Sequence, residues 1–191
     1  MTLKLNGSTS GSSSIDAPAS GGDRTITCPD ATGTMALTSN LLFSSYAIIC
    51  DQKDSGVDGG TFTSAAWRTR DLNTEIADPD GIVSISSNQF TLQAGTYLVK
   101  ATVPAYKATT HVAKLYNATD SSDIQMGTSQ TAHITYLGDA SSKISARFTL
   151  TGAKALEIQH ICSHTVASIG FGSGHSYGVN IYTLVEIYKE A

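Results

Sequence analysis

Residues 143–151 have the sequence Lys-Ile-Ser-Ala-Arg-Phe-Thr-Leu-Thr, in which apolar and polar side chains alternate. Successive side chains of a β-strand point to opposite faces, so this pattern predicts a strand with one buried and one exposed face. The following segment repeats the alternation, with Leu156, Ile158, His160 and Cys162 on one side. Together the two segments predict a half-buried β-sheet.

Segments of the same kind fill residues 45–191. The other expected strands lie at residues 45–51, 82–85, 89–93, 96–104, 111–117 and 180–189. Turn-forming residues separate these strands, and no segment has the apolar stripe of an amphipathic helix. About eight to ten short strands with this spacing predict an all-β protein, an antiparallel sandwich of the jelly-roll type.

In two of the expected strands the alternation assigns individual side chains to one face or the other. In residues 96–104 the side chains that share one face are Tyr97, Val99, Ala101 and Val103. In residues 180–189 we expect Ile181, Val185 and Ile187 on one face and Tyr182, Leu184 and Tyr188 on the other.

The composition changes near residue 44. Residues 1–44 contain no Trp or Tyr and a single Phe, which is too little large apolar surface for a core of their own. Short strand-like runs nevertheless stand between turn signals, and their apolar residues are Leu3, Leu5, Ile26, Met35 and Leu37. We therefore expect an attachment and trimerisation arm over residues 1–44 and a head domain over residues 45–191.

The charge and cysteine content exclude several classes of function. A net charge of −4 and a pI of about 5.6 predict no nucleic-acid partner. No apolar run is long enough to insert into a membrane, and the first residues lack the apolar region of a secretory signal. Three widely spaced cysteines, Cys28, Cys50 and Cys162, predict neither a disulfide framework nor a zinc site. We expect no cofactor, and assembly in a reducing cytoplasm.

Three stretches, residues 67–75, 84–97 and 181–188, resemble the trimeric jelly roll shared by tumour necrosis factor and the globular heads of complement and collagen-like proteins. The run Phe-Thr-Leu-Gln-Ala-Gly-Thr-Tyr at 90–97 carries most of the resemblance. It implies a homotrimer in which side chains of the inner sheet meet around a three-fold axis. Tyr97, Tyr182 and Tyr188 are the candidates, because a tyrosine can bury its ring and still find a partner for its hydroxyl. The alternative is that these rings pack within one subunit.

Residues 1–40 resemble a segment of bacteriophage tail-fibre and virion proteins. The resembling runs are Leu-Asn-Gly-Ser-Thr-Ser-Gly-Ser at 5–12, Ala-Pro-Ala at 17–19 and Ile-Thr-Cys-Pro-Asp-Ala-Thr-Gly-Thr-Met-Ala-Leu-Thr-Ser at 26–39. The resemblance implies a structural protein of a tailed-phage virion, assembled in the host cytoplasm and held by other virion proteins such as the major capsid protein or a tail protein.

The short lead before the head favours a decoration or cement protein on the outer surface of the capsid, because a fibre normally carries a long shaft. One alternative is a short tail or head fibre whose head binds a host receptor or glycan. A second alternative is a free carbohydrate-binding or receptor-like trimer.

One cluster contains residue types that bind zinc or copper. His160 and Cys162 alternate on one strand face and His164 follows. Same-face neighbours on a strand lie roughly 7 Å apart, too far to share a small ion without a bend. We therefore favour the interpretation that His160 and Cys162 continue the apolar stripe, and we expect no metal.

Two loops contain further candidate binding residues. Asp51, Asp54 and Asp58 could supply oxygen ligands for calcium, but their spacing is not that of an EF-hand, which favours a solvated loop. The glycine-rich residues 170–178 lack a phosphate-loop motif and a following helix. They predict a mobile or closely packed loop.

In that glycine-rich loop Phe171, His175 and Tyr177 could form a contact patch, for example for a glycan. No nucleophile elbow and no carboxylate pair in an apolar setting is present, so we expect no enzymatic activity.

Overall fold

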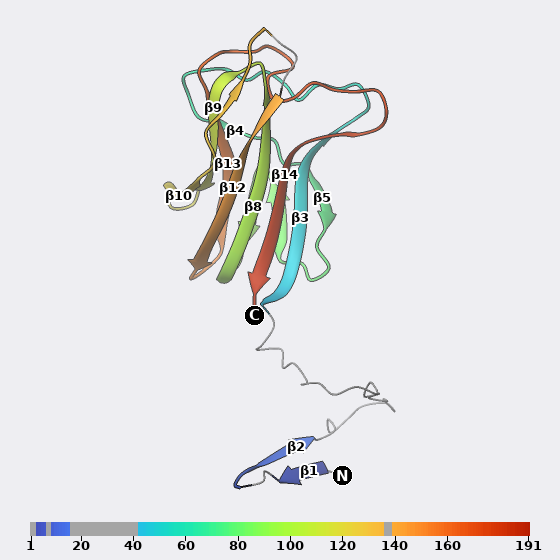
Figure 1. Cartoon of the computed structure of the whole chain (residues 1–191), viewed down its shortest axis with the longest axis vertical. Helices are drawn as coiled ribbons and strands as arrows, with labels where there is room; N and C mark the ends of the chain where they lie inside the picture. Colours follow the sequence, from blue (N-terminus) through green and yellow to red (C-terminus); the bar gives the residue numbers. More distant parts are fainter. Residues whose placement is uncertain (1–2, 7–8, 16–41, 136–138) are drawn as a thin grey trace. The chain divides into compact units, whose positions relative to one another are not determined.

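The computed structural model describes residues 3–6, 9–15, 42–135 and 139–191 (Figure 1). The chain divides into two compact units, Met1–Met35 and Ala36–Ala191. In the first unit strands β1 (Leu3–Asn6) and β2 (Ser12–Ile15) form an antiparallel hairpin in which Leu3 is paired with Ile15. A strand around Leu3 and Leu5 is thus confirmed.

The predicted arm residues Ile26, Met35 and Leu37 lie outside the described residues.

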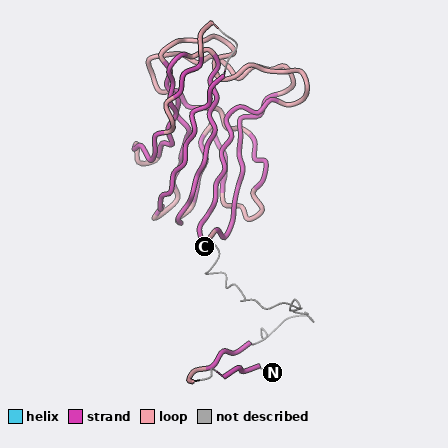
Figure 2. The backbone as a smooth tube through the Cα atoms, in the orientation of Figure 1, coloured by secondary structure: helices cyan, strands magenta, loops and turns pink. Residues whose placement is uncertain are grey.

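The second unit is a sandwich of two antiparallel sheets, and Figure 2 shows only strands and loops in its described part. One sheet has the order β10-β9-β13-β7-β6, with β11 also paired to β9 and β4 to β13. Its strands are β4 (Arg68–Thr69), β6 (Val83–Ser86), β7 (Gln89–Leu92), β9 (Thr109–Asn117), β10 (Ser122–Met126), β11 (Gln130–Ala132) and β13 (Lys154–Cys162).

The second sheet has five strands in the order β12-β8-β14-β3-β5. They are β3 (Phe43–Lys53), β5 (Thr74–Ala77), β8 (Gly95–Tyr106), β12 (Asp139–Leu150) and β14 (Asn180–Glu190). Figure 1 shows β8, β14 and β3 running side by side along this sheet. No helix among the described residues has the length and apolar character needed to span a bilayer.

The alternation read from the sequence places the core correctly. Tyr97, Val99, Ala101 and Val103 of β8 are all buried, and the alternating apolar residues of β13, Leu156 and Ile158, are fully buried in the facing sheet. These faces pack together into one apolar cluster between the two sheets. Because a buried aliphatic side chain contributes about 1.5–3 kcal/mol, the two facing stripes account for much of the driving force for the sandwich.

The predicted facing of residues 180–189 is wrong at its beginning. The pairing of β14 with β3 shifts between Ile181 and Leu184, which marks a β-bulge. A bulge changes the phase of the alternation. As a result Ile181 is exposed and Tyr182 is buried, whereas Val185 and Ile187 lie in the core as expected.

The head begins slightly before residue 45. Phe43 is the first residue of β3, and its ring centroid lies 5.2 Å from that of Tyr188. Ser44 donates from its hydroxyl to the carbonyls of Lys189 and Glu190 at 3.3 and 3.0 Å. These contacts attach residues 43 and 44 to the last strand of the sandwich.

Candidate functional site

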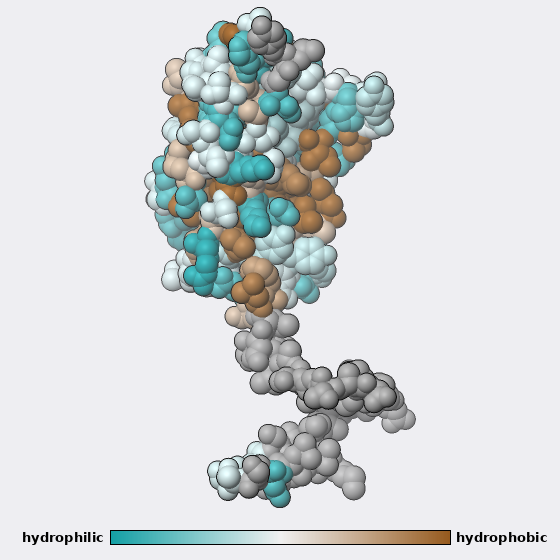
Figure 3. Space-filling model, viewed as in Figure 1, coloured by the Kyte–Doolittle hydropathy of each residue, from teal (hydrophilic) through white to brown (hydrophobic). Residues whose placement is uncertain are grey.

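The outer face of the five-stranded sheet carries a strip of apolar side chains. Tyr46 on β3 pairs with Tyr188 on β14, and Tyr188 pairs with Leu98 on β8. Directly paired residues of antiparallel strands point to the same face. The side chains of this outer strip, as we call it, are Tyr46, Ile48, Leu98, Ile181, Leu184 and Tyr188. Figure 3 shows hydrophobic residues gathered over β14 and β3.

The exposure of the outer strip is high for aliphatic and aromatic residues. Tyr46 is 44% exposed and Ile181 is 48% exposed. Charged residues lie within the strip and at its border. Glu186 stands between Leu184 and Tyr188 on β14 and is paired with Lys100 of β8. At the border, Arg147 donates through Nε and Nη2 to both carboxylate oxygens of Glu190, each at 2.7 Å. Apolar side chains combined with a few charged groups are the usual composition of a protein interface.

The three tyrosines predicted to meet around a three-fold axis lie in different places. Tyr188 lies on the outer strip, where its hydroxyl donates to Glu186 Oε1 at 3.1 Å. Tyr97 is fully buried between the sheets and donates to the carbonyl of Gln93 at 3.1 Å. Tyr182 is buried beneath a loop and donates to the carbonyl of Val57 at 2.7 Å. Tyr97 and Tyr182 thus follow the alternative interpretation and pack within one subunit.

The glycine-rich loop, residues 170–178, is closely packed against residues 54–60. Backbone hydrogen bonds join Gly59 N to Gly172 O at 2.9 Å, Phe171 N to Gly60 O at 3.1 Å and Gly56 N to His175 O at 2.8 Å. Of the two predictions for this loop, close packing is the one that the structure bears out. The two loops form a single connected layer at one end of the sandwich.

Glycine at position 172 is required by this packing. Its φ is +140°, and a Cβ atom there would lie 2.2 Å from Cδ1 of the Tyr182 ring. A side chain would therefore force the loop and the ring apart.

The three residues of the expected contact patch do not form one surface. His175 and Tyr177 are exposed and stack on each other with ring centroids 5.7 Å apart, and Tyr177 is 94% exposed. Phe171 turns inward, where its ring centroid lies 4.6 Å from that of Phe62. The surface patch on this loop is reduced to His175 and Tyr177.

The three aspartates considered for calcium have separate structural roles. Asp51 is buried, and its Oδ1 forms an ion pair with Lys53 Nζ at 3.1 Å. The backbone carbonyl of Asp54 accepts from the Asn180 amide, and Asp58 Oδ1 accepts from Gly174 N at 2.8 Å. Asp58 thus holds one loop against the other.

The zinc-type cluster does not form either. His160 is fully buried and Cys162 nearly so, but His164 lies in an exposed turn. The thiol of Cys162 donates to the carbonyl of His164 at 3.2 Å, which turns the sulfur toward the backbone. Within the described residues no group of three His, Cys, Asp or Glu side chains is placed to hold a metal ion.

His160 instead pairs with His111, which no sequence motif singled out. Nδ1 of His111 lies 2.9 Å from Nε2 of His160, and both rings are buried. Burial, with Arg70 nearby, lowers the pKa of His111 to about 4 and that of His160 to about 2. Both imidazoles are therefore neutral over the physiological pH range.

Arg70 is the second buried polar residue that sequence patterns missed. Its guanidinium donates to Thr183 Oγ1 at 2.8 Å and to the carbonyls of Pro104 and Phe171 at 3.2 and 3.1 Å. The same group lies 4.0 Å from the Phe171 ring centroid. Burial lowers its pKa to about 9, against the opposing effect of Asp51 and Asp71. One side chain thus connects β8, β14 and the glycine-rich loop.

By sequence, no protein-family model matches the chain and no curated protein is significantly similar to it. By structure, murine APRIL at pH 5.0 is similar with a TM-score of 0.50 and 11% identity, over 76% of this chain and 98% of that chain. The globular domain of zebrafish complement 1qA has a TM-score of 0.48 and 9% identity, over 76% and 97% of the two chains. Eiger TNF from S. frugiperda has a TM-score of 0.49 and 13% identity, over 79% and 94%.

The chain has an antiparallel jelly-roll fold similar to that of murine APRIL. This confirms the fold predicted from the alternating strands and from the resemblance of residues 67–75, 84–97 and 181–188. At these identities the likeness concerns the fold of the jelly-roll head, and the function of the head has to be inferred from its own surfaces.

Proposed function

We propose that the protein is a non-catalytic structural module that forms a homotrimer through the outer strip of its five-stranded sheet. The observation that carries the proposal is the exposure of Tyr46 and Ile181 on one sheet face, next to the half-buried Tyr188. Leaving such side chains in water costs about 25 cal/mol for each Å² of apolar surface, which association would recover.

Three-fold association through a sheet face agrees with the charges that lie within the strip and at its border. In a closed ring each subunit presents two different patches, one to each neighbour. Lys100 and Glu186 within the sheet face, and Arg147 with Glu190 at its border, supply both signs of charge for such contacts. These charges then fix the register of the subunits, while the apolar side chains of the outer strip supply the buried area.

The proposed role of residues 1–44 is attachment. The β1–β2 hairpin belongs to a compact unit of its own, and its few apolar residues suit pairing with another chain better than an independent core. With the resemblance of residues 1–40 to virion proteins, this supports a decoration protein on the outer surface of a phage capsid, bound to capsid subunits. Three arms on one trimer would multiply weak contacts.

Two other roles use the same trimer. A short fibre would use the exposed His175 and Tyr177 pair to contact a host receptor or glycan. A free receptor-like module would have no virion partner. Quantifying the chain in purified particles separates the three roles: hundreds of copies support decoration, a few trimers at the tail support a fibre, and absence supports a free module.

The trimer is tested by charge substitutions on the outer strip. Ile181→Asp and Tyr46→Asp should each convert a trimer into monomers, measured by light scattering after size-exclusion chromatography, because a carboxylate cannot be buried without a partner. Met126→Asp is the matched control, since Met126 is 43% exposed but lies on β10 of the other sheet. A wild-type chain that is monomeric at micromolar concentration, or trimers that survive both strip variants, would contradict the proposal.

A further inference from the structure

The seven-stranded sheet has a cavity on its outer face, on the side of the sandwich opposite to the outer strip. Its volume is about 710 Å³, and it lies where β9, β11 and β13 meet. His111 and Cys162 point into the sandwich, so their chain neighbours Val112 and Ile161, which are paired with each other, point outward. These two half-buried side chains form an apolar floor between more polar walls.

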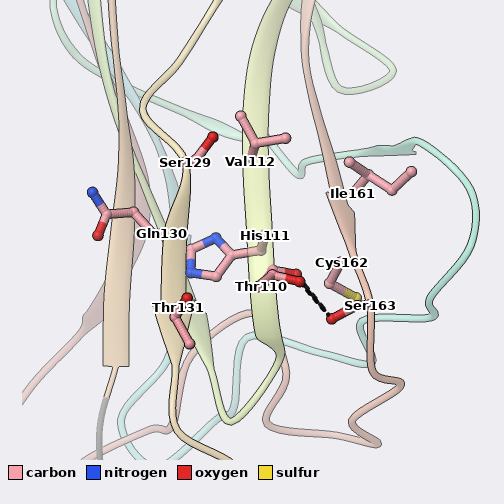
Figure 4. Close-up of a pocket in the computed structure, with 9 residues that line it drawn as sticks. All are labelled: Thr110, His111, Val112, Ser129, Gln130, Thr131, Ile161, Cys162 and Ser163. Carbon is pink, nitrogen blue, oxygen red and sulfur yellow. Dashed lines mark hydrogen bonds between the residues drawn. The ribbon is translucent and has the colours of Figure 1, made fainter.

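Hydroxyl groups line most of the cavity walls, together with Gln130. Figure 4 shows Ser129 and Thr131 on one side of β9, and Ser163 on the other side beside Thr110. Ser163 Oγ and Thr110 Oγ1 are 2.8 Å apart and hold each other in place. By contrast, the hydroxyls of Ser129 and Thr131 have no hydrogen-bond partner among the described residues and are free to bind a ligand.

The cavity is electrically neutral. Its lining contains no Asp, Glu, Lys or Arg side chain. The buried His111 has a pKa of about 4, and burial also raises the pKa of the Cys162 thiol. A charged ligand would therefore lose its hydration without gaining a counter-charge from the lining. Arg68, whose charge acts to lower the pKa of the Cys162 thiol, is exposed and does not line the cavity.

An aromatic wall continues from the cavity along the same face of β9. Lys114, two residues beyond Val112, places Nζ 4.2 Å from the ring centroid of Trp67 and 4.9 Å from that of Tyr116. Its charge is balanced by Asp123, with Nζ to Oδ1 at 2.5 Å, and its side chain is only 8% exposed. The face next to the cavity thus offers fixed rings without a free charge.

We propose that this cavity binds a neutral saccharide, with the free hydroxyls of Ser129 and Thr131 bonded to sugar hydroxyls and the sugar C–H face packed on Val112 and Ile161. A purely apolar ligand would leave the wall hydroxyls unpaired, which costs about 1–3 kcal/mol for each group. A few polar groups around an apolar floor orient a ligand that has both characters. The site lies on the sheet opposite to the outer strip and does not depend on the trimer.

The test uses the full-length protein on an array of neutral and anionic oligosaccharides, followed by calorimetric titration with the neutral trisaccharide that binds most strongly. Thr131→Arg should fill the cavity and lower the affinity at least tenfold, and Thr131→Val, which removes only the hydroxyl, should lower it several-fold. Ser84→Arg is the control, because Ser84 is exposed on β6 of the same sheet and does not line the cavity.

Soluble trisaccharides and long polysaccharides of the same sugars are tested separately. Binding of either ligand to the wild type that is lost in Thr131→Arg supports the site. Light scattering on every variant reports the subunit assembly separately, so a monomeric wild type would contradict the trimer and not this site. Binding to no neutral saccharide, binding to anionic saccharides alone, or full affinity in Thr131→Arg would overturn the proposal.

Discussion

Nδ1 of His111 lies 2.9 Å from Nε2 of His160 inside the jelly-roll head, and each ring is at most 3% exposed. One imidazole donates this hydrogen bond and the other accepts it, so the accepting ring is neutral. Burial lowers the pKa of both rings and keeps the donating ring neutral near pH 7 as well. Arg70 adds a positive charge nearby, and its field lowers the pKa of both histidines further. The pair therefore makes the fold sensitive to acid.

The free energy of unfolding should fall as the pH drops from 7.5 to 5. The folded pKa values, about 4 and about 2, lie below the unfolded value of about 6.5, so the unfolded state binds more protons in this range. Each histidine should lower the free energy of unfolding by about 2 kcal/mol between pH 7.5 and pH 5. Urea unfolding at several pH values measures how steeply the free energy of unfolding changes with pH. His111→Gln should reduce this slope by about half.

The control for this effect is His175→Ala. His175 is exposed on the glycine-rich loop and should leave the slope unchanged. A wild-type unfolding free energy that is constant between pH 7.5 and 5 would show that the buried pair takes up protons without unfolding.

Arg70→Ala should lower the free energy of unfolding by about 3–5 kcal/mol, measured by the urea midpoint. The change removes the donors for the carbonyls of Pro104 and Phe171 and leaves both without this partner. Arg68→Ala is the matched control, because Arg68 is exposed and its guanidinium, among the described residues, donates only to the carbonyl of Thr63 at 3.4 Å. Equal losses in the two variants would mean that the hydrogen bonds of Arg70 contribute nothing specific.

The long strands could be predicted from sequence because one physical rule governs them. In β8, β12 and β13 one face is buried along most of the strand, so the two-residue period of the side chains is visible in the order of residues. β14 departs from that rule at the bulge after Ile181, and no residue type there indicates that the alternation of buried and exposed side chains shifts by one residue. The short strands β4 and β11 have too few residues to show a period.

The polar interior could not be predicted in the same way. Arg70 stands in a hydrophilic stretch and is buried only because residues about 100 positions away, at Phe171 and Thr183, fold over it. Similarly, His111 becomes half of a pair through its place beside β13, which depends on the register of two strands. Such long-range pairings leave no local pattern in the chain.

Gly172→Ala should destabilise the head by about 2–4 kcal/mol, through backbone strain and the contact of the new methyl group with the Tyr182 ring. Amide exchange at Gly56 and Gly59 should speed up, because their hydrogen bonds join the two loops. Gly152→Ala is the control, since nothing lies within 4 Å of a Cβ atom at that position. Unchanged exchange at both amides would contradict the coupling of the two loops.

Removal of residues 2–40 should leave a head that folds and associates as the full chain does, because β3 begins at Phe43 and the core cluster lies entirely beyond it. Phe43 and Ser44 must be retained, since they contact Tyr188 and the end of β14. Circular dichroism and light scattering measure fold and assembly, and incubation with particles that lack the protein measures attachment. We expect the same assembly and the loss of attachment.

The two readouts separate the two parts of the proposal. If the shortened head binds particles as well as the full chain, attachment depends on the jelly roll and the arm has another purpose. If the shortened head no longer self-associates, residues 2–40 carry the contacts assigned to the outer strip. In that case charge substitutions at Tyr46 and Ile181 should have no effect on the full chain, because the exposed apolar side chains of β3 and β14 would not be the surface that joins the subunits.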